Sequence, residues 1–232
     1  MRHEITGTTL PVLTLTLEAG ETVLAETDRL SWMTSNVAMR TTTATGGSSG
    51  FFGAIGRALG GGGLFMTEFT AEGGEALVAF AATVPGNIIE TRVGAGRGYL
   101  IHRHGFLAGA PTLALGVGVQ QSLGAGVFGG EGFVLQHLTG EGTAFIELGG
   151  EIVSYDLTAG QDLLVHPGHV GMFEESVSFE ITTVRGVKNM IFGGDGLFLA
   201  HLSGPGKVWL QTLTPSKLAH ALRPYLPTGE HR

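Results

Sequence analysis

The chain has no cysteine, and only 14% of its 232 residues are charged. Without cysteine there are no disulfides, thiolate metal sites or thiol nucleophiles, which is compatible with a reducing compartment. A chain that is 43% hydrophobic and so weakly charged is too apolar to be intrinsically disordered. Thirteen Lys and Arg against twenty Asp and Glu give a formal charge of −7. Because phosphate backbones attract basic surfaces, this balance disfavours nucleic-acid binding.

Long hydrophobic runs are also missing. No uninterrupted run approaches the ~20 residues of a membrane-spanning helix. The opening MRHEITGTTL does not place a cationic segment before an apolar one, as a secretory signal does, so a cytoplasmic location is predicted. Apolar residues gather only at 51–59, inside the glycine-rich stretch 46–66. That segment is interpreted as a short helical turn in a connection, with contact to a membrane surface as the alternative.

Glycine, by contrast, is abundant, with 40 residues, and it belongs to an internal repeat. The segments GGGGLFMTEFTAEGGEALVAF (60–80), FGGEGFVLQHLTGEGTAFIEL (128–148) and FGGDGLFLAHLSGPGKVWLQTL (192–213) align with one another. A second segment, with an x-A-G turn, recurs around Gly20, Gly96 and Gly160. The sequence therefore predicts a single domain, 1–232, of three pseudo-repeats at about 10–82, 83–150 and 151–213.

Short alternating apolar stretches between glycine turns predict strands. Turns such as Gly140-Glu141-Gly142 and Pro205-Gly206 indicate that each long segment forms a β-hairpin. Three such units predict an all-β body with pseudo-threefold symmetry, in the manner of a β-prism or double-stranded β-helix. One short helix is predicted at 215–223, with Thr214 as its N-cap and Pro215 in its first turn.

The combination of DLTAGQDLLVHPGHVGMFEESVSFEI (156–181) and VKNMIFGGDGLFLAHLSGPGKVWLQT (187–212) resembles the altered inheritance of mitochondria protein 24 family. The segment LEAGETVLAETDRLSWMTSNVAM, with Trp32, is similar to the opening of that family. The resemblance implies a fold like that of the tryptophan RNA-binding attenuation protein and self-assembly as a homo-oligomer, with a trimer as one arrangement. It brings no catalytic motif, and the shared fold does not transfer RNA binding. The mitochondrial member of the family is associated with inner-membrane organisation.

Histidines supply the candidate chemistry. GRGYLIHRHGF places His102 and His104 after a turn glycine, as in the cupin metal motif, although the glutamate expected next is missing. The equivalent segment of the third repeat contains His166 and His169. Together these four imidazoles are a candidate site for a divalent metal.

A second candidate metal site follows from the repeat, because Glu68, His137 and His201 occupy equivalent positions on equivalent strands. Near a threefold axis they would form a ring of two histidines and one carboxylate. Away from such an axis they would face solvent.

No nucleophile elbow or phosphate loop is present, so enzyme activity has no positive support and no cofactor other than a divalent metal is predicted. The preferred hypothesis is a non-enzymatic, self-associating β-scaffold whose apolar surfaces contact another copy, a protein partner or a membrane surface. A cupin-like metal-binding protein is the alternative.

Overall fold

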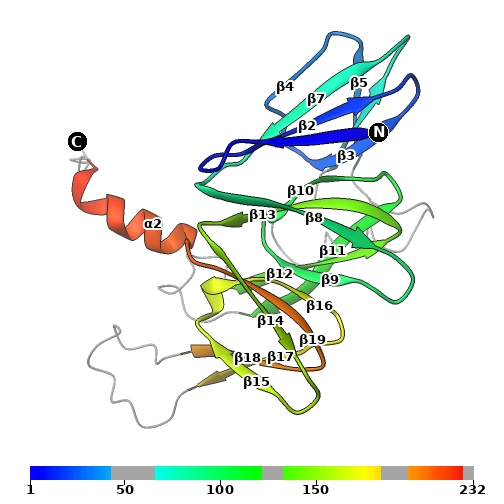
Figure 1. Cartoon of the computed structure of the whole chain (residues 1–232). Helices are drawn as coiled ribbons and strands as arrows, with labels where there is room; N and C mark the ends of the chain where they lie inside the picture. The colour runs from blue at the N-terminus through cyan, green and yellow to red at the C-terminus, as the bar shows by residue number, and fades with distance from the viewer. Residues whose placement is uncertain (43–65, 122–132, 184–197, 227–232) are drawn as a thin grey trace.

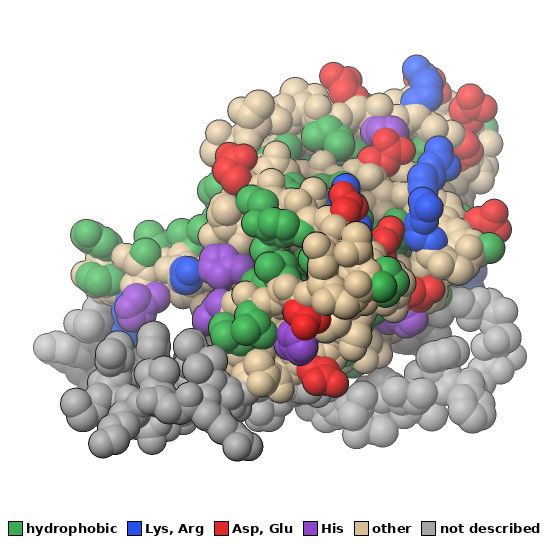
Figure 2. Space-filling model, turned by 60° about the horizontal axis from the view of Figure 1, so that its bottom comes forward, with side chains coloured by type: hydrophobic (Ala, Val, Ile, Leu, Met, Phe, Trp, Pro, Cys, Tyr) green, Lys and Arg blue, Asp and Glu red, His purple; other side chains and the backbone are tan. Residues whose placement is uncertain are grey.

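The computed structural model describes residues 1–42, 66–121, 133–183 and 198–226, and this part of the chain is an all-β fold. Its strands form four antiparallel sheets that follow one another along the molecule, from the N-terminal strands at the top of Figure 1 to the C-terminal strands at the bottom. Hydrophobic side chains remain at the surface beside charged ones on the face drawn in Figure 2. The apolar segment 51–59 and the opening glycines of the long repeated segments lie outside the described residues.

The first two sheets contain the N-terminal strands. Sheet 1 has the order β1-β2-β7-β4, and sheet 2 the order β5-β6-β3-β10-β13-β8. The strands of sheet 1 are β1 (Arg2–Thr6), β2 (Val12–Leu17), β7 (Ala76–Ala81) and β4 (Trp32–Met33). Those of sheet 2 are β5 (Val37–Thr42), β6 (Met66–Ala71), β3 (Thr22–Glu26), β10 (Phe106–Gly109), β13 (Gly142–Gly149) and β8 (Gly86–Val93).

The other two sheets contain the C-terminal strands. Sheet 3 has the order β11-β12-β9-β16-β19-β14, and sheet 4 the order β15-β18-β17. The strands of sheet 3 are β11 (Leu113–Gln121), β12 (Phe133–Gly140), β9 (Tyr99–His102), β16 (Val170–Glu174), β19 (Gly206–Gln211) and β14 (Ile152–Leu157). Those of sheet 4 are β15 (Asp162–Val165), β18 (Phe198–Ser203) and β17 (Ser178–Thr183).

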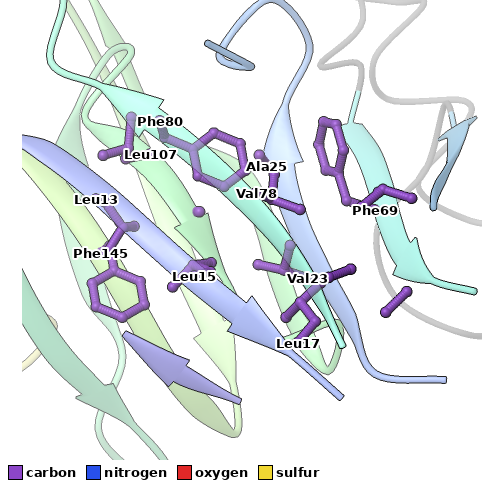
Figure 3. Close-up of a cluster of buried hydrophobic side chains, with 14 of the residues drawn as sticks. Leu13, Leu15, Leu17, Val23, Ala25, Phe69, Val78, Phe80, Leu107 and Phe145 are labelled. Carbon is purple, nitrogen blue, oxygen red and sulfur yellow. The ribbon is translucent and has the colours of Figure 1, made fainter. Parts of the chain in front are cut away.

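Three hydrophobic cores fill the spaces between consecutive sheets. In the first, alternation along β2 turns Leu13, Leu15 and Leu17 toward sheet 2 (Figure 3). Phe80 of β7 meets Phe69 of β6 edge to face, with ring centroids 5.6 Å apart, so the aromatic contact joins the two sheets. Because an inner sheet lies between two cores, it buries apolar side chains on both of its faces.

The predicted hairpins are wrong in one respect: the two strands of each long repeated segment do not pair with each other. β6 lies in sheet 2 and β7 in sheet 1, β12 in sheet 3 and β13 in sheet 2, β18 in sheet 4 and β19 in sheet 3. The glycine turn between them is thus an arch that carries the chain from one sheet to the next. Gly140 and Gly142 have φ values of +101° and +142°, in the region that glycine tolerates.

The two inner sheets have corresponding strand orders. The set β5-β6-β3 in sheet 2 corresponds to β11-β12-β9 in sheet 3 and to β17-β18-β15 in sheet 4. The remaining strands of sheets 2 and 3 form the sets β10-β13-β8 and β16-β19-β14, which correspond to β4-β7-β2 of sheet 1. Each inner sheet therefore joins two three-stranded sets that come from successive stretches of the chain.

The predicted C-terminal helix is confirmed as α2 (Pro215–Leu222), which is followed by a 3₁₀ turn, η2 (Arg223–Tyr225). Thr214 is its N-cap, and its hydroxyl accepts a hydrogen bond from the backbone N–H of Lys217. The helix projects from the sheets in Figure 1 and buries none of its own residues. No helix in the described ranges is long and apolar enough to cross a membrane.

Candidate functional site

A pocket of about 470 Å³ lies where the turn after β3, the turn after β9 and the strand β13 meet. Its walls include Glu26, Arg29, His102, His104 and Glu147. We call it the charged pocket. Of these side chains Glu26, Arg29 and Glu147 are buried, so two carboxylates and one guanidinium are withdrawn from water. Such groups need partners inside the protein to offset their lost hydration.

Glu147 of β13 has a partner for each carboxylate oxygen. Its Oε2 accepts a hydrogen bond from Nη1 of Arg29 at 2.9 Å. Its Oε1 accepts three, from the backbone N–H of Thr83 at 2.6 Å, the hydroxyl of Thr83 at 2.8 Å and the backbone N–H of Val84 at 3.1 Å. Glu147 therefore fastens the connection between β7 and β8 to the inside of sheet 2.

Arg29 links this carboxylate to a second one. Its Nε lies 3.6 Å from Oε2 of Glu26, and its Nη2 donates to the backbone carbonyl of His104. Nε2 of Gln136 donates to Oε1 of Glu26 at 2.6 Å. Burial by itself raises the pKa of Glu26, but the contacts with His104, Gln136 and Arg29 outweigh it and lower that pKa below its usual value. The carboxylate of Glu26 is therefore held in its charged form.

His102 and His104 lie at the edge of this network. Nε2 of His102 is 2.9 Å from the backbone carbonyl of Glu147, so it donates a hydrogen bond there. Burial lowers the pKa of His102, which favours the neutral form, although the Glu147 carbonyl acts in the opposite direction. His104 is exposed, has φ of +63° and places Nδ1 3.7 Å from Glu26. One imidazole anchors a strand and the other faces solvent.

His166 and His169 lie at the 3₁₀ turn η1 (Pro167–His169), with their rings 5.9 Å apart. Nδ1 of His169 is 2.7 Å from the backbone carbonyl of Gln211, and its Nε2 is 2.6 Å from Nζ of Lys217. An ammonium group thus occupies the position that a metal bound to Nε2 would need. Burial first, and then the charges of His169 and Lys217, lower the pKa of His166. This cluster fixes the base of α2 to β19.

Glu68, His137 and His201 lie on β6, β12 and β18, in three different sheets. Each imidazole has a carboxylate of its own: Nε2 of His137 is 3.1 Å from Glu175, and Nε2 of His201 is 3.4 Å from Asp162. Within residues 1–42, 66–121, 133–183 and 198–226, no group of three or more His, Asp or Glu side chains is arranged to hold a metal ion. Metal binding by the seven residues singled out from the sequence stays a prediction.

The charged pocket contains three residues that the sequence motifs do not single out, Glu26, Arg29 and Glu147. The register of the x-A-G segments contains a signal for the first, because the sixth residue after Gly20, Gly96 and Gly160 is Glu26, His102 and His166. Glu147 has only a weak signal, as the one acidic residue within the apolar run TAFIELGG. Arg29 has no signal among the sequence motifs: Glu26 lies three residues before it, but Glu147 is 118 residues away.

The protein is therefore of the all-β class and consists of consecutive antiparallel sheets. Its buried charged side chains form ion pairs that link the connections between strands. Residues 3–213 match the model of the family described as mitochondrial biogenesis AIM24, and the chain belongs to this family. The predicted family resemblance is thereby confirmed.

Two proteins of Streptococcus pyogenes are similar to this chain over nearly its whole length. An uncharacterized protein of Streptococcus pyogenes serotype M6 is 28% identical over 228 residues, which cover 95% of this chain and 89% of the relative. The crystal structure of protein SPYM3_0169 from Streptococcus pyogenes is similar to this chain with a TM-score of 0.75 and 24% identity, over 97% of this chain and 99% of the other. At this identity the second comparison shows the shared fold alone.

Proposed function

We propose that the protein is a non-enzymatic, self-associating β-scaffold that works in the cytoplasm as a homo-oligomer. The observation that carries this proposal is the exposure of large hydrophobic side chains on edge strands of the four sheets, β4, β5, β11, β14 and β15, and in the C-terminal segment that begins with α2. The most exposed are Leu10, Trp32, Met39, Val117, Leu164, Tyr225 and Leu226. Apolar surface of this kind is stabilised by removal from water, which association provides.

The charged pocket supports a structural role rather than catalysis. Both oxygens of Glu147 accept hydrogen bonds from the protein, and Arg29 contacts two carboxylates and a carbonyl. A general base or nucleophile needs a free lone pair that faces substrate. These groups instead use their hydrogen-bonding capacity to hold neighbouring connections together.

The sheet topology supports a further part of the proposal, that the body consists of three copies of one six-stranded unit, as in a double-stranded β-helix. The units are β2 to β7, β8 to β13 and β14 to β19. Each unit contributes one three-stranded set to one sheet and a second set to the next sheet. The residues aligned by the repeated glycines occupy corresponding strands in all three.

Multi-angle light scattering during size-exclusion chromatography tests the scaffold proposal. The expected result is a mass that is a whole multiple of the chain mass of 24.1 kDa, with a trimer as the specific expectation. A mass of one chain across the micromolar range would refute self-association. Catalytic turnover traced to side chains of the charged pocket would refute the non-enzymatic part.

A further inference from the structure

Two internal junctions connect the three-stranded sets within the inner sheets. In sheet 2, β3 pairs with β10, with Ala25 opposite Ala108 and Leu24 opposite Gly109. In sheet 3, β9 pairs with β16, with Ile101 opposite Met172 and Leu100 opposite Phe173. Both junctions are antiparallel.

The two junctions use the same positions of the repeated units. Counted from Gly20, Gly96 or Gly160, the fourth and fifth residues of one unit lie opposite the thirteenth and twelfth residues of the next. The third unit has no successor in the chain, and the first has no predecessor. The fourth and fifth residues of the third unit are Leu164 and Val165, and the twelfth and thirteenth residues of the first unit are Trp32 and Met33.

At each end of the molecule, one strand of such a junction is present without the strand that would pair with it. β15 and β4 are edge strands, and among the described strands each has a pairing partner on one side alone. Leu164 is 59% exposed, whereas Leu24, at the same position of the first unit, is 3% exposed. Trp32 is 52% exposed, whereas Ala108 and Met172, at the same position of the other units, are 0% exposed. The two ends thus display large apolar side chains where the internal junctions bury theirs.

Toward the centre of the two terminal sheets, the outer faces carry several polar side chains. The face of β2 that points away from the first core carries Val12, Thr14 and Thr16. On sheet 4, His201 and Ser203 of β18 point away from the third core, and so does Leu164 of β15, which lies opposite His201. Hydroxyls and an imidazole can stay hydrated, whereas an edge strand keeps unpaired N–H and C=O groups that a second strand can satisfy.

We propose that β15 of one protomer pairs with β4 of a second copy, antiparallel, with Val165 opposite Trp32 and Leu164 opposite Met33. Sheet 4 of one copy and sheet 1 of the next then form one continuous sheet of the kind seen in sheets 2 and 3. The proposal rests on the proposed self-association and names its interface. The contact joins two different surfaces, so it is heterologous and produces a closed ring or an open filament.

The absence of cysteine from the chain allows a direct test. Leu164→Cys protein is mixed with Met33→Cys protein and oxidised. Opposed residues of an antiparallel pair have Cα atoms about 4.5–5.5 Å apart, which a disulfide can bridge. The expected product is a disulfide-linked heterodimer, in at least tenfold higher yield than in a control mixture of Val117→Cys and Val153→Cys proteins. The control residues are exposed and lie on the two edge strands of sheet 3.

A charge at the interface gives a second measurement, which does not depend on oxidation. Leu164→Lys is expected to raise the concentration of half-dissociation at least tenfold, whereas Val117→Lys leaves it unchanged. An oligomer that neither cross-links in this register nor responds to Leu164→Lys would overturn the interface and leave the scaffold proposal intact. Efficient disulfide formation within the Leu164→Cys protein alone would favour a symmetric contact and overturn the head-to-tail arrangement. A monomeric mass for the unmodified protein would overturn both proposals.

Discussion

Replacing Arg29 by Met tests whether the buried charges of the charged pocket act as one unit. Methionine is similar in length to arginine but leaves Glu147, 2.9 Å from Nη1, and Glu26, 3.6 Å from Nε, without their shared cation. Removing one partner of a buried ion pair typically costs about 3–5 kcal/mol, because a charge is left uncompensated in a poorly hydrated site. We expect Arg29→Met to lower the free energy of unfolding by about that amount, measured by urea denaturation followed by circular dichroism.

The matched control for this change is Arg2→Met. Arg2 forms an ion pair with Glu75 in which both side chains are exposed, and such pairs contribute under about 1 kcal/mol. The double variant Arg29→Met/Glu147→Gln is expected to recover part of the loss, because it removes one unpaired charge and keeps an acceptor for Thr83 and Val84. If Arg29→Met costs no more than Arg2→Met, the buried network does not hold the connections together.

Three further outcomes are expected. Burial lowers the pKa of His102 in the folded state, so the unfolded chain binds a proton before the folded chain does as the pH falls below about 6.5. The free energy of unfolding should therefore fall by up to about 1.4 kcal/mol per pH unit. A His102→Asn variant whose urea midpoint keeps the same pH dependence would contradict this. Gly140→Ala should lose clearly more stability in thermal unfolding than Gly160→Ala. Gly140 has φ of +101°, and a Cβ at this position would lie 2.4 Å from the carbonyl of Thr112. A Cβ at Gly160 would meet nothing within 4 Å, so Gly160→Ala should cost about 1–2 kcal/mol, the cost of the left-handed conformation. Addition of zinc, nickel or manganese is expected to leave the Tm of dialysed protein unchanged, since Nε2 of His169 already contacts Lys217. Bound metal in elemental analysis together with a higher Tm would instead support the cupin-like alternative.

Local features of the fold could be predicted from the sequence because their causes are local. Alternation of apolar residues marks the strands, and the Thr214-Pro215 pair marks the start of α2 to the residue. The hairpins could not be distinguished from arches, because a glycine turn looks the same in the sequence whether the next strand pairs with the previous one or crosses to another sheet. Whether a hairpin or an arch forms depends on which strand pairs most favourably with each sheet edge.

The candidate site was less predictable for a related reason. Alignment of the x-A-G segments brings His102 and His166 into register with Glu26, but it does not predict which of these side chains will contact a carboxylate. Arg29 and Glu147 are 118 residues apart, and Glu26 and Gln136 are 110 apart. Contacts at such separations follow from the stacking of the sheets, which single-residue patterns do not encode.

The arches between sheets have a consequence for how the chain can be divided. A cut after residue 150 would leave sheet 3 without β16, β19 and β14 and would open the edge of β9 along its whole length. Part of the second core would be exposed to solvent in the fragment, because that core contains apolar side chains from both halves of sheet 3. We therefore expect the four sheets to fold as one cooperative body, and truncated fragments to aggregate rather than behave as smaller independent domains.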